Sequence, residues 1–393
     1  MNTPDAPCFR LNPTVRWLFA ATLALMGVGL LMVYSAGMSA DPSERFVMFQ
    51  RQIVYVPLAV GVLLVAMRLP YQWLNRWYVV LGLLALTVVL LAAVLRFGAE
   101  VNGARRWFRF SLGAFDLSVQ PSEVAKLCLI LCFAWFLSRP GDHVRSFLRG
   151  FVPLAVMLAI VCGLVARQDL GTAVLLGAVG AVMMVAGGVQ LFHMATLVPP
   201  AVAAMYVLIV YEPYRLTRLM TYLDPWKDPE DAGYHVTQSL MAIGSGGWFG
   251  RGLGHGMQKL GHLPEDTTDF IFSVISEEMG VAGAAMVILL FAVVVLLGLR
   301  VVGRSDNRFA MLTALGIVLW IGLQAVINIG VATAALPTKG ISLPLVSYGG
   351  SGLLLTAGAL GVLMSIAART AELNSVGDDR AAGTMTLPGM RAA

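Results

Sequence analysis

The sequence is short of charged residues, and this scarcity sets its class. Only 12% of the 393 residues are charged, whereas 58% are hydrophobic. Soluble domains carry about 25% charged residues. Because one water-soluble core could not bury so much apolar surface, the composition excludes a soluble globular protein and predicts an integral membrane protein.

Patterns typical of metal, nucleotide and nucleophile sites are also missing. The four cysteines show no disulfide framework; Cys128 and Cys132 share a helical face, but no histidine accompanies them, so packing is the preferred interpretation. Glycines alternate over residues 252–256 without a preceding strand, which argues against a dinucleotide fingerprint. No Ser-His-Asp arrangement or ATP-binding loop appears, and no nucleic-acid partner is expected. Any chemistry must therefore draw on an activated substrate.

Long apolar runs, in contrast, are abundant. A transmembrane helix needs about 20 apolar residues, and ten runs approach that length. They cover residues 17–38, 52–68, 77–96, 119–138, 150–166, 169–188, 191–211, 270–299, 309–335 and 343–368. The prediction is an all-α integral membrane protein with about ten transmembrane helices, in which the adjacent prolines at 199 and 200 kink the seventh run.

Residues 1–16, 17–368 and 369–393 are predicted to be a cytoplasmic N-terminal segment, the membrane domain and a disordered cytoplasmic tail. Lys and Arg are equally numerous on the two sides of this topology. One set lies in compact loops and tails, whereas most of the other lies in loops 97–118 and 212–268, where the positive-inside rule is weak. We therefore place these two loops outside the cytoplasm, the larger one between spans 7 and 8. An anionic substrate would explain their basic residues.

A cluster of carboxylates lies where the chain re-enters the membrane. Glu265, Asp266 and Asp269 fall within five residues, immediately before an apolar run. Ionisable groups at that depth are costly and are usually kept for chemistry or transport. An ordinary solvated loop remains an equally open interpretation.

The fourth run begins with a pair of opposite charges. Glu123 and Lys126 are three residues apart, so they share a helix face and can pair. Lys126 lies about one turn inside hydrocarbon, where a lone ammonium is expensive. The pair is either a structural ion pair between helices or the charged wall of a cavity that meets a polar headgroup. Asp169, at the start of the sixth run, is explained by N-capping alone.

The segment before the last run is broken by Pro337, Gly340 and Pro344. Non-helical backbone at that depth must face protein or a wet cavity. Lys339 could meet a phosphate there. The following Tyr348-Gly-Gly-Ser-Gly could equally serve close helix packing.

Taken together, these motifs resemble the SEDS family (shape, elongation, division and sporulation). The resemblance runs in order over about residues 15–370 and rests on Asn102-Gly-Ala-Arg-Arg-Trp, Gln120-Pro-Ser-Glu-Val-Ala-Lys, Asp169-Leu-Gly-Thr-Ala, Leu263-Pro-Glu-x-x-Thr-Asp-Phe-Ile-Phe, Glu277-Glu-x-Gly and Ser347-Tyr-Gly-Gly-Ser. The first motif and Pro337-Thr-Lys-Gly favour the cell-division branch over the elongation branch. Two local departures occur: Arg167-Gln168-Asp169 stands where the family usually has Gln-Pro-Asp, and His262 stands where an aromatic is common.

The resemblance implies a peptidoglycan glycosyltransferase that polymerises lipid II for septal wall synthesis and releases undecaprenyl pyrophosphate. It implies that Asp269 is the essential carboxylate and that Glu123 and Lys126 belong to the cavity. It also implies a class B penicillin-binding protein (FtsI-like) as transpeptidase partner and FtsQ, FtsL and FtsB as division regulators.

An inverting transfer needs a base for the acceptor hydroxyl and stabilisation of the leaving pyrophosphate. Asp269 suits the base. The candidates for substrate binding are Arg105, Arg106, Lys126, Lys339, Glu123 and Glu265. A divalent cation (Mg or Mn) could share this role, although the sequence shows no ligand set. A lipid II flippase and a non-catalytic septal scaffold are the alternatives, and only polymerisation requires a base.

Overall fold

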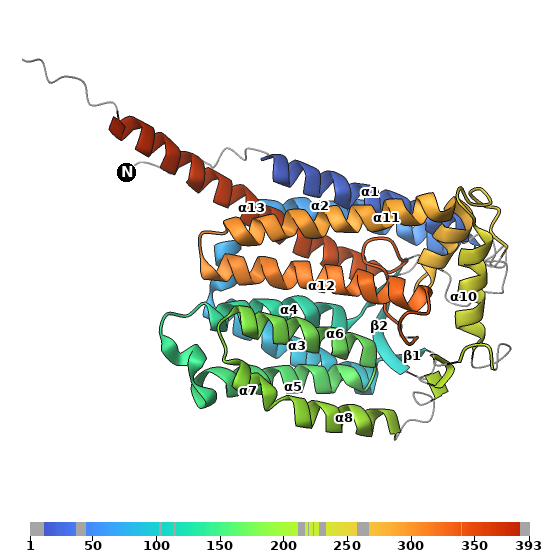
Figure 1. Ribbon diagram of the computed structural model, residues 1–393, viewed down its shortest axis with the longest axis horizontal. Helices are drawn as coiled ribbons and strands as arrows, with labels where there is room; N and C mark the ends of the chain where they lie inside the picture. The colour runs from blue at the N-terminus through green and yellow to red at the C-terminus, as the bar shows by residue number, and fades with distance from the viewer. Residues whose placement is uncertain are drawn as a thin grey trace, which may run out of the picture.

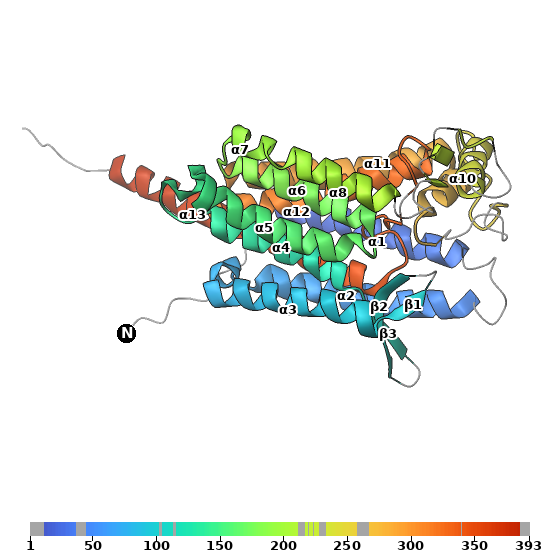
Figure 2. The ribbon, with the colours of Figure 1, turned by 90° about the horizontal axis from the view of Figure 1, so that it is seen from below.

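The computed structural model describes residues 12–36, 45–101, 104–112, 115–210, 217–218, 220–222, 224–227, 233–257, 267–338 and 340–385. Its long helices lie side by side along one axis (Figures 1 and 2). The first helix begins and the last helix ends at the same end of this bundle, which we call the terminal end (Figure 1). Helix α10 and strands β1 and β2 lie at the opposite end, which we call the loop end.

Each predicted apolar run corresponds to one helix or, for the seventh run, to a pair of helices. The elements are α1 Pro13–Ala36, α2 Arg45–Arg68, α3 Trp77–Phe97, α4 Pro121–Leu137, α5 Val152–Ala166, α6 Leu170–Ala186, α7 Leu191–Ala195, α8 Val198–Val210, α11 Ile271–Arg304, α12 Arg308–Ala332 and α13 Gly350–Met385. Short 3-10 turns cover Tyr71–Asn75 and Asp142–Arg145, and a π-helical turn covers Phe147–Phe151.

Among the described residues, eight helical stretches are long and apolar enough to cross a membrane, and α6 is a shorter apolar helix. The predicted class, a mostly helical multi-pass membrane protein, is confirmed. The count of ten spans and the domain boundaries stay predictions. The last helix runs to Met385, through much of the segment 369–393 for which the sequence predicts disorder.

The seventh run is interrupted as the sequence predicts. α7 ends at Ala195, and α8 begins at Val198 with Pro199 and Pro200 in its first turn. Proline has no N–H to donate and its ring clashes with the carbonyl four residues back, so it is tolerated in a first turn but not in a helix interior. The break therefore falls immediately before the two prolines.

Helix α4 lies deep in the bundle and brings its charged residues with it. It packs against α3, α6 and α12, and most of its side chains are buried. The backbones of α4 and α12 approach closely at Gly316, where an added Cβ would lie 2.5 Å from a methyl group of Ile130. Small residues allow such approaches between membrane helices. Glu123 and Lys126 are consequently enclosed by protein rather than lipid.

Loop 97–118 contains a small antiparallel sheet that its sequence did not predict. Strands β1 Ala99–Val101, β2 Ala104–Leu112 and β3 Phe115–Val119 pair in that order (Figure 2). Successive side chains of a strand point to opposite faces. Arg105 and Arg106 on β2 therefore point in opposite directions.

Residues 246–257 of loop 212–268 are fastened to a kink in α11. Helix α10 covers Tyr234–Ser245 within this loop. Gly280 has a φ of 67°, and an added Cβ there would lie 2.4 Å from the amide nitrogen of Gly250. The buried carboxylates of Glu277 and Glu278 accept hydrogen bonds from the backbone N–H groups of Met257 (2.8 Å) and Gly254 (3.1 Å). The Glu-Glu-x-Gly motif thus holds residues 246–257 in place.

Candidate functional site

A cavity of about 590 Å³ opens near the loop end of the bundle. Its walls come from strands β2 and β3, the starts of α4, α6, α10 and α13, the turn 267–270, helix α12 and the non-helical segment 340–349, with Arg218 beside them. The polar side chains that line it are Arg106, Ser118, Gln120, Glu123, Lys126, Asp169, Thr172, Arg218, His235, Thr268, Asp269, Gln324, Ser342, Ser347, Tyr348, Ser351 and Thr356. The cavity thus collects four of the predicted site residues: Arg106, Glu123, Lys126 and Asp269.

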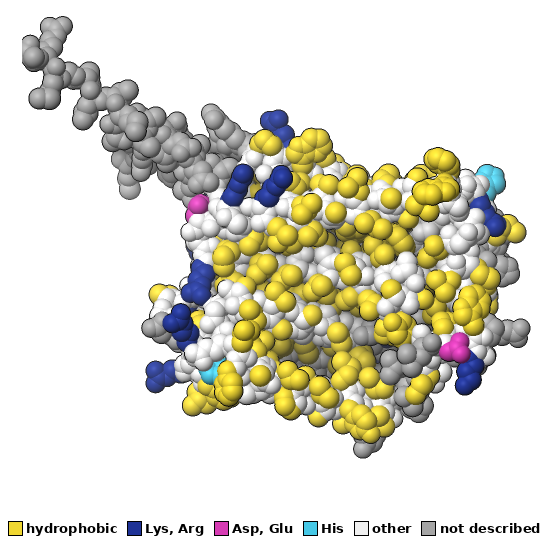
Figure 3. Space-filling view, viewed as in Figure 1, with side chains coloured by type: hydrophobic (Ala, Val, Ile, Leu, Met, Phe, Trp, Pro, Cys, Tyr) yellow, Lys and Arg dark blue, Asp and Glu magenta, His cyan; other side chains and the backbone are white. Residues whose placement is uncertain are grey.

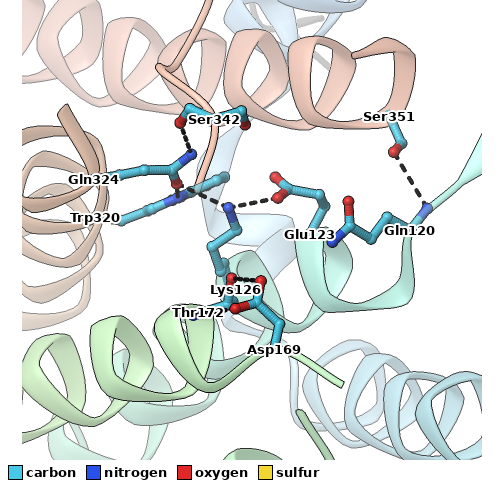
Figure 4. Close-up of polar contacts among 9 residues, drawn as sticks. All are labelled: Gln120, Glu123, Lys126, Asp169, Thr172, Trp320, Gln324, Ser342 and Ser351. Atoms are coloured by element: carbon cyan, nitrogen blue, oxygen red, sulfur yellow. Dashed lines mark hydrogen bonds and ion pairs between the residues drawn. The ribbon is translucent and has the colours of Figure 1, made fainter. Parts of the chain in front are cut away.

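The predicted Glu123–Lys126 pair forms and is buried. Lys126 Nζ lies 2.7 Å from Glu123 Oε1, and the two side chains are 2% and 9% exposed (Figure 4). Lys126 Nζ also donates a 2.8 Å hydrogen bond to Gln324 Oε1 and lies 5.0 Å from the centre of the Trp320 ring. Carboxylate, amide and aromatic face together offset the cost of holding an ammonium away from water.

Gln324 joins three parts of the site. Its Oε1 accepts hydrogen bonds from both Lys126 Nζ and Trp320 Nε1, the latter at 2.7 Å. Its Nε2 donates a 2.9 Å hydrogen bond to the carbonyl of Ser342 in the non-helical segment (Figure 4). Sequence reasoning missed this residue. The available signal was a polar amide inside the apolar run 309–335, where such groups are expensive.

Asp269 lies half-buried in the turn 267–270, directly before α11. Asn328 Nδ2 donates hydrogen bonds to the carbonyls of Asp269 (2.8 Å) and Ile341 (2.7 Å). Ser347 Oγ donates a 2.5 Å hydrogen bond to the carbonyl of Thr268. The backbone of the candidate base is therefore fixed against the segment 340–349 rather than left as a solvated loop.

Arg106 and Asp269 meet at Gly340. An added Cβ on Gly340 would lie 3.2 Å from Asp269 Oδ2 and 3.5 Å from Arg106 Nη1. The carboxylate and the guanidinium therefore reach the same small region of the cavity wall from different elements. The missing side chain of Gly340 leaves space between them.

The structure does not bring every predicted binding residue to this cavity. Arg105 points away from it: its Nη2 lies 3.3 Å from Glu100 Oε2, and its Nη1 donates to the carbonyl of Arg96. Its side chain is 47% exposed. Lys339 and Glu265 lie outside the described residues, so their roles stay predictions.

Asp169 caps α6 as the sequence predicts. Its Oδ1 accepts from the Thr172 N–H at 3.0 Å, and its Oδ2 accepts from Thr172 Oγ1 at 2.6 Å (Figure 4). The same carboxylate also lines the cavity. Capping therefore explains its conformation, and its position adds a second negative group to the wall that carries Lys126.

Across the described ranges, no group of three or more His, Cys, Asp or Glu side chains comes together in a way that could hold a metal ion. We therefore assign no ligand set to the divalent cation considered above. The described cavity wall carries three basic side chains, Arg106, Lys126 and Arg218, and three carboxylates, Glu123, Asp169 and Asp269.

Comparisons with known proteins identify the family of this chain. A family model described as a cell cycle protein, covering FtsW, RodA and SpoVE, matches residues 16–372. Two relatives, each named probable peptidoglycan glycosyltransferase FtsW, come from Tolumonas auensis and Escherichia coli O6:H1. The first is 41% identical, and the match covers 92% of this chain and 93% of the relative. The second is 39% identical, and the match covers 90% of this chain and 85% of the relative.

Two solved structures share the fold. The first is described as "Structural coordination of polymerization and crosslinking by a peptidoglycan synthase complex". Its matching chain has a TM-score of 0.72 and 29% sequence identity, and the match covers 90% of this chain and 96% of that chain. The second is the rod shape determining protein RodA of Thermus thermophilus, with a TM-score of 0.64 and 28% sequence identity; the match covers 89% of this chain and 95% of that chain. With a family model that spans most of the chain and relatives near 40% identity, the protein belongs to the SEDS family of cell cycle proteins that contains FtsW, RodA and SpoVE.

Proposed function

We propose that this protein is a peptidoglycan glycosyltransferase that polymerises lipid II into glycan strands for septal wall synthesis and releases undecaprenyl pyrophosphate. Family membership supports the activity. The structural observation that carries the proposal is the cavity in which a half-buried carboxylate, Asp269, shares a wall with Arg106 and a buried Lys126–Glu123 pair.

The chemistry is an inverting hexosyl transfer. The acceptor 4-hydroxyl attacks the anomeric carbon of the donor, a new C–O bond forms, and the bond to the pyrophosphate oxygen breaks with its electron pair. Asp269 takes the proton of the attacking hydroxyl, which raises its nucleophilicity in the transition state. The leaving pyrophosphate gains negative charge in that step, and fixed cations nearby stabilise it.

Lys126 is suited to hold an anionic oxygen. Its ammonium has three N–H donors, and the contacts among the described residues use two of them, on Glu123 and Gln324. The third can donate to a phosphate or a headgroup. Because Glu123, Gln324 and Trp320 fix the ammonium from different sides, binding would cost little further ordering.

Arg106 and Arg105 offer a matched comparison. Arg106→Ala is expected to lower the turnover of lipid II by about 10- to 100-fold, because a charge-assisted contact of a few kcal/mol is removed from the cavity wall. Arg105→Ala, one residue away on the opposite face of β2, is expected to stay within about twofold of wild type. Both are measured as initial rates of glycan formation from purified lipid II. Equal losses in the two variants would contradict the placement of the substrate in this cavity.

The proposed partners are a class B penicillin-binding protein that crosslinks the strands and the regulators FtsQ, FtsL and FtsB. The support for a transpeptidase partner is that one structural relative is a peptidoglycan synthase complex that couples polymerization with crosslinking. In this proposal the protein works at the division septum of the bacterial cytoplasmic membrane.

The loop end is proposed to face outward and the terminal end the cytoplasm. In a Cys8→Ser background, a membrane-impermeant maleimide should label Arg105→Cys in intact spheroplasts and should label Arg304→Cys only after the membrane is opened. These positions are exposed at opposite ends of the bundle, and the described cysteines are buried or half-buried. The reverse labelling pattern would overturn both the topology and the outward-facing substrate site.

A further inference from the structure

A second cavity, of about 260 Å³, is a groove between α3, α4 and α5 that the proposed chemistry does not use. It is lined by apolar side chains and one cysteine, among them Val80 and Val88 of α3, Trp135 of α4, and Met157 and Ile160 of α5. We call it the α3–α5 groove. It contains none of the residues of the polar cavity.

The α3–α5 groove lies in the half of the bundle next to the terminal end. On α3 its lining begins at Val80, about one turn after Arg76, and reaches Val88. At 1.5 Å per residue, the lined stretch of α3 is about 12 Å long. This length is close to the ~15 Å hydrocarbon thickness of one leaflet. The groove therefore has the length and position of a single acyl chain of the leaflet at the terminal end.

The mouth of the groove carries a fixed positive charge. The Arg139 guanidinium lies 3.7 Å from the centre of the Trp135 ring, and Trp135 itself lines the groove. Arg139 is exposed and has no ion pair among the described side chains. Stacking on the indole orients the guanidinium, and no described side chain forms an ion pair with its N–H groups, which suits them to an anion.

The surroundings of Arg139 are positive as well. Loop 69–76, which precedes α3, and loop 138–151, which joins α4 to α5, together contain four arginines (Arg76, Arg139, Arg145 and Arg149) and one acidic residue (Asp142). Lys and Arg side chains gather at this end of the molecule in Figure 3, whereas the middle of the bundle is apolar. A basic rim above an apolar groove between membrane helices matches the two halves of an anionic lipid.

We propose that the α3–α5 groove binds an anionic glycerophospholipid, with one acyl chain between α3 and α5 and its phosphate on Arg139. A zwitterionic lipid could fill the groove equally well, but its cationic headgroup would meet the arginine rim. The site therefore selects by charge. This inference does not depend on the proposed catalytic role of Asp269.

Native mass spectrometry of the purified full-length protein tests the proposal, after incubation with phosphatidylglycerol or phosphatidylcholine of identical acyl chains. Wild type is expected to retain more phosphatidylglycerol than phosphatidylcholine. In Arg139→Gln the retention of phosphatidylglycerol should fall about fivefold, because each basic residue contributes roughly 1 kcal/mol at an anionic lipid surface. Arg304 is an exposed arginine of α11 at the same end, so Arg304→Gln is the matched control and should change the retention of neither lipid.

A second variant tests the groove rather than the charge. Val156→Trp places a larger side chain on a half-exposed lining position and should reduce retention of phosphatidylglycerol while leaving the arginine rim intact. Equal retention of the two lipids by wild type would overturn the proposal. So would equal losses in Arg139→Gln and Arg304→Gln, or full retention by a folded Val156→Trp protein.

Discussion

Asp269→Asn is expected to reduce glycan polymerisation by about 100- to 10,000-fold, the range that a positioned general base contributes. The amide keeps the size of the side chain but cannot accept the proton of the acceptor hydroxyl at neutral pH. The measurement is the initial rate of strand formation from fluorescent lipid II, resolved by length on a gel.

The fold should survive this change, because the contacts of Asn328 and Ser347 that hold the turn use its backbone. Asn328 binds the Asp269 carbonyl, and Ser347 binds the Thr268 carbonyl. Thermal unfolding of the variant should therefore match wild type. Glu100→Gln, an exposed carboxylate at the same end of the molecule, serves as the control and should retain activity. Near-normal polymerisation by Asp269→Asn would refute the assignment of the base.

The second large effect is expected at Lys126. Lys126→Met removes one partner of a buried ion pair and leaves the Glu123 carboxylate uncompensated, which typically costs about 3–5 kcal/mol. Stability and activity should both fall. The unfolding temperature of the detergent-solubilised protein and the polymerisation rate report the two losses separately.

The double variant Glu123→Gln/Lys126→Met separates structure from function. Replacing both members of a buried pair by neutral groups of similar size is often close to neutral for stability, so the unfolding temperature should largely recover. Activity should not, because the ammonium proposed to hold the anionic donor is still missing. Recovery of both would mean that Glu123 and Lys126 form only a structural ion pair.

Local signals in the sequence predicted much of this site. The apolar runs located the helices because each had to match the thickness of a bilayer. Asp169 was recognisable as a cap because its carboxylate precedes a helix. The spacing of Glu123 and Lys126 predicted their pairing, which the structure confirms at 2.7 Å.

Contacts between distant segments could not be predicted in this way. Arg105 and Arg106 were both predicted to bind substrate, because loop 97–118 showed no pattern of strand pairing. In the structure, strand β2 places the two side chains on opposite faces, and only Arg106 lines the cavity. Gln324 was hidden in an apolar run, and its three hydrogen bonds come from α4, its own helix and the segment 340–349. The meeting of Asp269 and Arg106 at Gly340 likewise depends on three segments that only the fold brings together.

The buried Glu123–Lys126 pair on α4 would also suit a lipid II flippase, and a scaffold would need no chemistry at all. One measurement separates these functions. Purified protein with its transpeptidase partner, whose crosslinking activity is blocked, is reconstituted in liposomes with labelled lipid II. Strand formation and lipid translocation are then followed in the same sample. We expect wild type to form long glycan strands, and Asp269→Asn to form none while remaining inserted and bound to the partner; translocation of lipid II without strand formation by wild type would contradict the proposed function.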